Sequence, residues 1–147
     1  MDRGASQPYH FAPMENRWTF TIEWGDCDAA GIVFYPNYFR WFDAAFQQLL
    51  RQRGLGQRQL GERYGIIGTG LIDCGARFKG PAAYGDVVEL VTRIERFEPL
   101  SFTVRHIVFK AGRTIVEGFE KRAFLSPGES EGRLKALPVP EAFKALF

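Results

Sequence analysis

The first regular pattern in the chain is an alternation of apolar and polar residues. Over residues 18–24, Phe20, Ile22 and Trp24 alternate with threonine and glutamate side chains. A period of two is typical of a strand with one buried face, so the pattern predicts a β-strand here. Residues 1–16 are polar, contain two prolines and have no period. We interpret them as a flexible N-terminal tail.

A long helix is predicted next. From Pro36 to Arg53 apolar residues recur at steps of three and four, which places them on one helical face: Tyr38, Trp41, Phe42, Ala45, Phe46, Leu49 and Leu50. Pro36 suits the first helical position, where its missing N–H would have no partner in any case. Gly54 suits the position after the end. Because one face is apolar, the helix must pack against another element.

Four further strands are predicted, over residues 66–79, 86–97, 101–110 and 113–125. The sequence at 110–113 fits a hairpin turn between the last two, and Pro99 interrupts the pattern between the second and third. Glycines in 54–65 indicate a loop with one helical turn. Residues 126–140 are rich in turn residues, and 141–147 fit one last helical turn.

The last of these strands has the clearest division into two faces. Ile115, Phe119, Ala123 and Leu125 fall on one side, and Thr114, Glu120 and Arg122 on the other. Val116 and Phe124 depart from this division, so we expect both faces of the strand to be partly covered. One strand, one long helix and four more strands predict an α+β fold, with an antiparallel sheet around the helix, as a single domain over 17–147.

Composition and charge exclude several classes of function. The chain of 147 residues is 46% hydrophobic with a net charge of only +2, and its basic residues are scattered, which argues against nucleic-acid binding. We find no apolar stretch long enough to span a membrane. The two cysteines have no metal-like spacing and fit a reducing compartment, so we expect a cytoplasmic protein. Neither histidine has a nearby partner for a metal, and no metal site is predicted.

The junction between the first strand and the helix holds the chemistry. The helix start at Pro36 leaves backbone N–H groups free, with the positive end of the helix dipole behind them, and such a site can hold an oxyanion. The carboxylate of Asp28 lies seven residues before Tyr35. The run from Asp26 to Tyr38, DCDAAGIVFYPNY, continuing RWFDAA, resembles the signature of the 4-hydroxybenzoyl-CoA thioesterase family. A weaker likeness extends over most of the chain.

This resemblance implies a hot-dog fold, in which a sheet of about five strands wraps around one helix. It also implies hydrolysis of an acyl-CoA thioester, with an aromatic acyl group such as 4-hydroxybenzoyl, without a metal or organic cofactor beyond the CoA of the substrate. The family has active sites between subunits, so a homo-oligomer, dimer or tetramer, is expected. Two alternatives are a non-catalytic acyl-CoA-binding protein and a hot-dog dehydratase or hydratase. The second of these usually pairs the aspartate with a histidine near the helix start, which this chain lacks.

The resemblance assigns roles to individual residues. Asp28 corresponds to the catalytic carboxylate, a nucleophile or a general base, although an aspartate here could also cap the following turn. Asp26 is interpreted as structural, holding the turn. The Tyr35 amide would polarise the thioester carbonyl, while its side chain fits either the core or the acyl pocket. Gly31 and Thr69 are the predicted substrate-binding residues, and each also has an ordinary structural explanation, a turn and a strand position.

Two further points concern polar residues. His106 alternates with apolar neighbours in a strand and is interpreted as a structural histidine with satisfied hydrogen bonds. Known family members have a basic run that meets the CoA phosphates where this chain has Glu98-Pro99-Leu100. The alternative basic residues for this task are Lys79, Arg96, Lys121 and Arg122, without a ranking.

Overall fold

The computed structural model describes residues 14–147 as a sheet packed on one long helix. Its elements are β1 (Glu15–Thr21), the 3-10 turn η1 (Trp24–Asp26), α1 (Pro36–Arg51), α2 (Gln57–Tyr64), β2 (Gly68–Phe78), β3 (Val87–Phe97), β4 (Phe102–Lys110), β5 (Arg113–Pro127), β6 (Leu134–Leu137) and α3 (Glu141–Lys144). The strands are antiparallel in the order β1-β3-β4-β5-β2, with β6 pairing with the end of β5. The predicted α+β architecture is confirmed.

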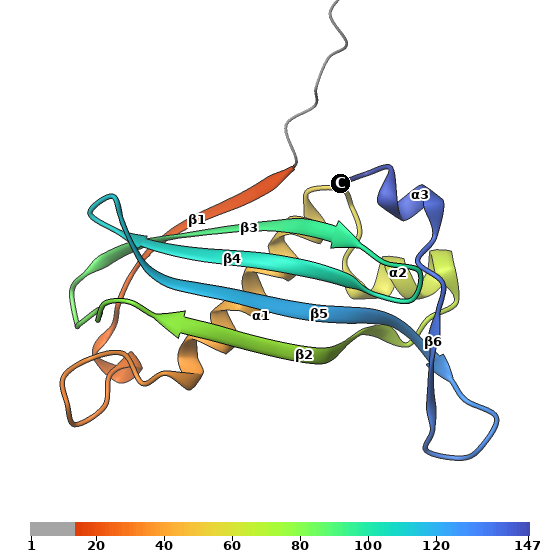
Figure 1. The fold of residues 1–147 in the computed structure, drawn as a ribbon, viewed down its shortest axis with the longest axis horizontal. Coiled ribbons are helices and arrows are strands. Elements are labelled where there is room, and N and C mark those ends of the chain that lie inside the picture. The colour runs from red at the N-terminus through yellow and green to blue at the C-terminus, as the bar shows by residue number, and fades with distance from the viewer. Residues whose placement is uncertain (1–13) are drawn as a thin grey trace, which may run out of the picture.

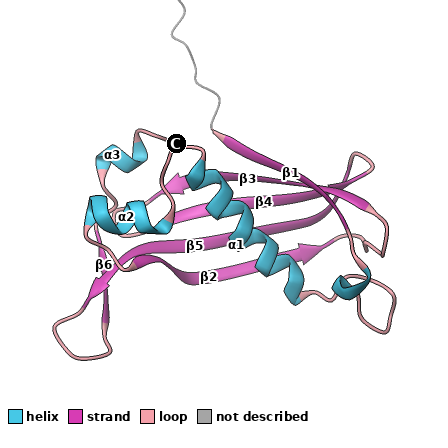
Figure 2. Ribbon diagram, turned by 180° about the vertical axis from the view of Figure 1, so that it is seen from behind, coloured by secondary structure: helices cyan, strands magenta, loops and turns pink. Residues whose placement is uncertain are grey.

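Helix α1 crosses one face of the sheet diagonally (Figure 2). All seven residues of its predicted apolar stripe are buried. Its first half packs into one apolar cluster with Ile22 and Val116, and its second half into another with Phe102 and Phe124. Burial of a large apolar side chain contributes about 2 kcal/mol, so this stripe is sufficient to fix the helix on the sheet. No helix in residues 14–147 is long and apolar enough to cross a membrane.

The inner face of the last predicted strand carries buried charged residues, and both faces of the strand are partly covered. In β5 the side facing α1 carries Gly118, Glu120 and Arg122, which are buried, whereas Phe119 is only half-buried on the outer face. The register explains this, because Gly118 pairs with His106 on the inner face of β4. Glu120 and Arg122 are tolerated inside because each has charged or polar partners there.

Several boundaries differ from the sequence prediction. Strand β1 begins at Glu15, so the last two residues of the predicted tail are in the sheet, and residues 1–13 lie outside the described part. Asn16 is buried there and hydrogen-bonds to Gln48 of α1 and to Gln52, which caps the end of this helix. The strand also ends at Thr21 instead of residue 24, because the chain turns through η1.

The segments after α1 contain more regular structure than the sequence predicted. Beyond the C-terminal end of α1, Gly54 has a positive φ, which suits the predicted stop, and the following segment forms α2, two turns of helix where one was expected. The 126–140 segment includes the unpredicted short strand β6. The final helical turn is present as α3. In Figures 1 and 2, α2, α3 and β6 lie at one end of the molecule, and the start of α1 lies at the other.

Strand β2 forms one edge of the sheet (Figure 1). It pairs with β5 on one side, and among residues 14–147 no strand pairs with its other side. Leu71, Ile72 and Phe78 on this strand are each at least half exposed. A long edge strand with exposed apolar side chains is a surface that proteins normally cover by pairing.

Candidate active site

The loop between η1 and α1 is a tight, internally bonded turn. A β-bridge joins Cys27 to Val33, and the Asp28 N–H donates to the Ile32 carbonyl at 3.0 Å. Gly31 has a φ of +81°, a conformation that few other residues adopt readily. An added Cβ would meet no atom of this chain within 4 Å, so the turn itself explains the glycine. The open space beside it is compatible with the predicted substrate contact.

Asp28 lies at the base of this turn with its side chain exposed. Its Oδ1 accepts a hydrogen bond of 2.8 Å from the Ala30 N–H, which is a local Asx turn. Within residues 14–147, Oδ2 has no hydrogen-bond partner or ion pair. The local turn is therefore real, but it uses only one oxygen. The other oxygen is available as a nucleophile or a general base.

Asp26 is a structural residue, as predicted. Its Oδ2 accepts from the Glu23 N–H at 2.9 Å, and its backbone carbonyl accepts from the Phe34 N–H and the Asn37 side chain. Arg40 of α1 forms a weaker ion pair with its carboxylate at 3.7 Å. These contacts tie η1, the loop and the first turn of α1 into one unit.

Tyr35 is the N-cap of α1 and Pro36 is its first helical residue, as predicted. The N–H groups on either side are used: Phe34 donates to Asp26, and Asn37 and Tyr38 donate to carbonyls of residues 34 and 35. The Tyr35 N–H itself has no acceptor within residues 14–147. It lies at the positive end of a helix of 16 residues, where a negative charge is favoured.

A cavity of about 380 Å³ lies beside the start of α1. Its walls are mostly apolar, and the lining residues are Ile32, Val33, Tyr35, Tyr38, Phe78, Lys79, Gly80, Pro81 and Ala82. Tyr35 lines the cavity and is 60% exposed, so its side chain is not part of the core. Burial, with smaller effects of the charges of Cys27 and Asp86, raises the pKa of Tyr38 to about 12. Its hydroxyl therefore stays protonated and can donate a hydrogen bond.

Thr69 lies far from this cavity in the same chain. It is buried near the beginning of β2, whereas Phe78, in the cavity wall, ends that strand. At about 3.3 Å per residue the two are roughly 30 Å apart. Thr69 instead lines a second cavity of about 280 Å³, together with Asp43, Gln57 and Arg122. One chain alone does not bring Thr69 together with Asp28, Gly31 and Tyr35.

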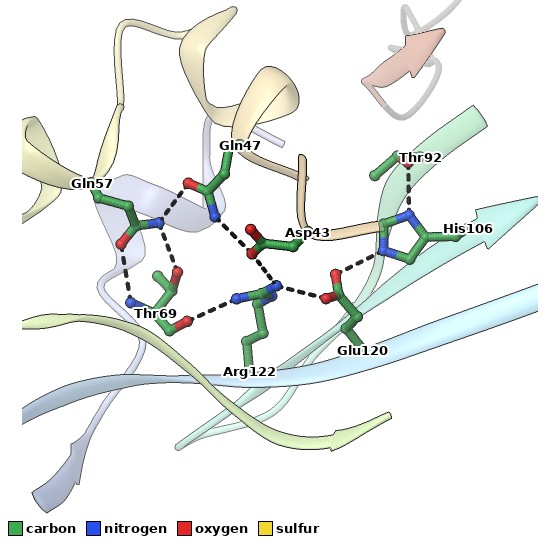
Figure 3. A network of polar contacts seen from close by, with 8 residues as sticks. All are labelled: Asp43, Gln47, Gln57, Thr69, Thr92, His106, Glu120 and Arg122. Carbon is green, nitrogen blue, oxygen red and sulfur yellow. Dashed lines mark hydrogen bonds and ion pairs between the residues drawn. The ribbon is translucent and has the colours of Figure 1, made fainter. Parts of the chain in front are cut away.

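A polar network surrounds Thr69 (Figure 3). The Arg122 guanidinium donates to the Thr69 carbonyl at 2.9 Å, to Asp43 at 2.9 Å and to Glu120 at 2.6 Å. Gln57 accepts from the Thr69 N–H and donates to its hydroxyl. The hydroxyl and backbone of Thr69 are thus held from two sides. Asp43 remains 56% exposed, at the mouth of the cavity.

His106 is the inner end of this network and is fully buried, which confirms the structural interpretation. Its Nδ1 lies 2.7 Å from the Thr92 hydroxyl and its Nε2 lies 2.8 Å from Glu120. Burial lowers the pKa of His106. Burial opposes ionisation of Glu120 as well, but the hydrogen bond with His106 and the charge and hydrogen bond of Arg122 outweigh it and lower the pKa of Glu120. We therefore take His106 as neutral and Glu120 as ionised.

The remaining basic residues are mostly neutralised. Glu98, in the segment where the family has a basic run, pairs with both Arg96 and Lys121. Lys79 pairs with Glu117 but also lines the cavity beside Tyr35. A wider depression, about 720 Å³, lies on the opposite face of the sheet, and neither Asp28 nor Tyr35 lines it. In residues 14–147 no group of three or more His, Cys, Asp or Glu side chains is arranged for a metal ion.

Comparison with known proteins identifies the family. Residues 22–147 match the model of the thioesterase-like superfamily. The chain belongs to this superfamily. It is 40% identical over 126 residues to 4-hydroxybenzoyl-CoA thioesterase from Pseudomonas sp. (strain CBS-3), covering 81% of this chain and 87% of that protein. The predicted enzyme class, a thioesterase, is confirmed.

Solved structures of this superfamily share the fold. A 4-hydroxybenzoyl CoA thioesterase in which one Asp is replaced by Asn, complexed with 4-hydroxybenzoyl CoA, is 37% identical with a TM-score of 0.81 and covers 90% of this chain and 98% of its own. A gentisyl-coenzyme A thioesterase is 34% identical with a TM-score of 0.72, covering 89% and 98%. The predicted hot-dog fold is confirmed.

Sequence reasoning missed three residues of the two cavities of this thioesterase. The sequence predicts Tyr38 and Asp43 as helix residues without a role in a site, and it offers Arg122 for phosphate binding but not for the second cavity. A signal was available for Asp43, because it is a charged residue one step from the buried Phe42 and lies within the family motif. Arg122 gave no such signal, since an arginine in a strand is normally solvated.

Proposed function

We propose that this chain hydrolyses an acyl-CoA thioester, with a hydroxylated aromatic acyl group such as 4-hydroxybenzoyl, to the free acid and CoA. The observation that carries the proposal is the junction before α1. A carboxylate oxygen of Asp28 and the Tyr35 N–H, neither with a partner in the described chain, belong to one internally bonded loop beside an apolar cavity. A general base or nucleophile and an oxyanion donor are the two groups that thioester hydrolysis requires.

In the proposed reaction the thioester carbonyl oxygen accepts a hydrogen bond from the Tyr35 N–H. Either Asp28 removes a proton from a water whose oxygen attacks the carbonyl carbon, or the carboxylate attacks and water hydrolyses the resulting anhydride. In both cases the C–S bond breaks and CoA leaves as the thiol after protonation. The charge that develops on the carbonyl oxygen is stabilised by the N–H and the helix dipole. No metal or organic cofactor is required in this scheme.

The acyl group is proposed from the second cavity. The Oδ1 of Asp43 is occupied by Arg122 and Gln47, and its Oδ2 has no partner within residues 14–147. An ionised carboxylate only accepts hydrogen bonds, so this oxygen suits a ligand that donates one, such as a phenol. Ile67 and Leu125 supply apolar walls. The relatives named for 4-hydroxybenzoyl and gentisyl thioesters support the same class of acyl group.

A second copy of the chain is needed to join the two cavities. We infer that β2 pairs antiparallel with β2 of a second copy across its open edge, in a dimer or as half of a tetramer. An antiparallel pair places the Thr69 end of one strand beside the Phe78 end of the other. The cavity lined by Tyr35 in one subunit (the Tyr35 cavity) would then adjoin the cavity lined by Thr69 and Asp43 in its partner (the Asp43 cavity). The exposed Leu71 and Ile72 support this, because pairing would cover them.

The CoA nucleotide is assigned to the side of the Tyr35 cavity. Lys79 lines that cavity, whereas Arg122 is buried in ion pairs and is unsuited to binding a phosphate.

Cys27 and Cys74 are both free thiols. This supports our expectation of a reducing, cytoplasmic location, where acyl-CoA thioesters would be available.

The proposal is tested by thiol release from 4-hydroxybenzoyl-, benzoyl-, phenylacetyl- and medium-chain acyl-CoA. Asp28→Asn should lower kcat by at least about 10²-fold in a folded protein, because the amide neither attacks nor accepts the proton. Glu62→Gln is the matched control, since it removes one exposed carboxylate on α2 and should retain full activity. Equal rates for wild type and Asp28→Asn, or no turnover of any substrate, would leave an acyl-CoA-binding protein as the better description.

The two roles of Asp28 are separated by isotope labelling. In a single turnover in ¹⁸O-water, attack through an anhydride and hydrolysis at the Asp28 carbonyl would transfer label to the Asp28 side chain, which identifies the nucleophilic route. Label only in the released acid would show that water attacks the acyl carbonyl carbon, as base catalysis requires.

A further inference from the structure

Arg122 is a buried cation with an unusual set of partners. Its side chain is 6% exposed, and its two terminal nitrogens contact three oxygen-bearing groups: the Thr69 carbonyl, Asp43 and Glu120. These groups come from β2, α1 and β5, so a single guanidinium joins three elements (Figure 3). The planar fork of an arginine makes such simultaneous contacts possible, which the single ammonium group of lysine cannot reproduce.

Arg122 is itself held in place by Glu120 and by the ring of Phe46. Glu120 accepts from Arg122 through Oε2 and contacts His106 through Oε1. The His106 ring stacks on Phe42 with 4.5 Å between ring centroids and an angle of 7°, and Phe46 lies under the guanidinium at 4.6 Å. Because Glu120 is an acceptor, a neutral His106 donates to it from Nε2 and accepts from Thr92 at Nδ1. The chain Thr92–His106–Glu120–Arg122 is thus directed toward the Asp43 cavity.

The stability of the fold does not explain this arrangement. Buried ion pairs seldom stabilise a protein relative to apolar side chains of similar size, because desolvation opposes the attraction between the charges. The Nε of Arg122 is also buried without a hydrogen-bond partner, an additional cost. The feature that an apolar core would lose is the fixed position of two oxygen-bearing groups at the cavity, the Asp43 carboxylate and the Thr69 carbonyl.

We propose that Arg122 is a positioning residue for the acyl group: held by Glu120 and His106, it orients the Asp43 carboxylate so that its free oxygen faces a hydroxyl of the ligand. This rests on the proposed function for the identity of the ligand. Arg122 does not contact the reacting carbonyl. Its loss should therefore remove the preference for a hydroxylated acyl group, while binding of the rest of the ligand is retained.

The test measures binding, so that it does not depend on turnover. The probes are the thioethers 4-hydroxybenzyl-CoA and benzyl-CoA, which cannot be hydrolysed, and calorimetry gives a Kd for each. We expect wild type to bind the hydroxylated probe at least tenfold more tightly. Arg122→Lys should reduce this ratio to below twofold, with the Kd for benzyl-CoA changed by less than twofold. Arg105→Lys is the matched control, because Arg105 lies on the neighbouring strand, paired with Glu95 on the outer face, and should keep the full ratio.

A second variant guards against misfolding of Arg122→Lys. Glu120→Gln keeps the size of the side chain but removes the charge that holds Arg122, and it should lower the ratio at least threefold. The proposal is overturned if wild type does not distinguish the probes, if Arg122→Lys keeps the wild-type ratio, or if both affinities fall by the same factor. The proposed hydrolysis fails separately, through the Asp28→Asn assay, because the thioethers report only on binding.

Discussion

Gly118 tests the packing between α1 and the sheet. An ideal Cβ added at this position would lie 2.5 Å from Cζ of Phe42 and closer still to Cε2. Carbon atoms in contact are normally about 3.5–4 Å apart, so in Gly118→Ala the ring must move by roughly 1 Å or more. Phe42 is fully buried and stacked on His106, which leaves the ring no free space to move into.

The expected cost follows from two opposing effects. Overpacking a core costs about 1–3 kcal/mol. Replacing glycine by alanine also restricts the unfolded chain, which returns about 0.4–1 kcal/mol. We therefore expect Gly118→Ala to lower the free energy of unfolding by about 1–2 kcal/mol, or roughly 2–8 °C in Tm for a chain of this size.

The assay is urea unfolding at a fixed protein concentration, because assembly adds to apparent stability. Gly25→Ala is the control, since its Cβ would meet no atom within 4 Å and Gly25 has no positive φ. It should leave the midpoint unchanged. Combining Gly118→Ala with Phe42→Leu should cost less than the sum of the two single changes, because the smaller side chain accommodates the methyl group. Full stability of Gly118→Ala, or strict additivity, would refute the packing argument.

Three further predictions concern the site and the assembly. Tyr35→Pro removes the proposed oxyanion donor and should lower kcat about 10²-fold relative to Tyr35→Ala, which keeps the N–H; equal rates would contradict that role. Burial lowers the pKa of His106 below its ordinary 6.5, so the unfolded chain takes up the proton at a higher pH than the folded chain. The free energy of unfolding should therefore fall as the pH drops below about 6.5, by at most about 1.4 kcal/mol per pH unit. His106→Gln should flatten this slope, as measured by denaturation between pH 7 and 5.5. Ile72→Lys should give monomers in sedimentation while Thr21→Lys, on the opposite edge strand, should not.

The sequence was most informative where one local pattern decides the structure. The stripe from Tyr38 to Leu50 predicted α1, and Pro36 and Gly54 marked its two ends, because capping depends on a few adjacent residues. The sequence did not decide which face of β5 lies inside, for the opposite reason. Burial of Glu120 and Arg122 is possible only with the partners that three other elements supply, and no local pattern contains those partners.

The candidate site shows the same limit. Asp28, Gly31 and Tyr35 are close in the sequence, and the turn that joins them was visible in the motif. Thr69 could be named from the resemblance, but its distance along β2 from Phe78, which lines the cavity with Tyr35, is a property of the sheet. Whether two residues share a site depends on which strand ends meet, and no single segment contains that information.

The position of the two cavities at opposite ends of β2 has a genetic consequence. In the proposed dimer each subunit donates the catalytic loop to one site and the acyl cavity to the other. Two altered proteins, one changed at Asp28 and without turnover, the other changed at Arg122 and without the preference for a hydroxylated acyl group, would then form mixed dimers in which one site has both defects and the other has none. Co-expression of the two alleles should therefore restore part of the preference for a hydroxylated acyl-CoA in turnover, because each mixed dimer carries a single unaltered site.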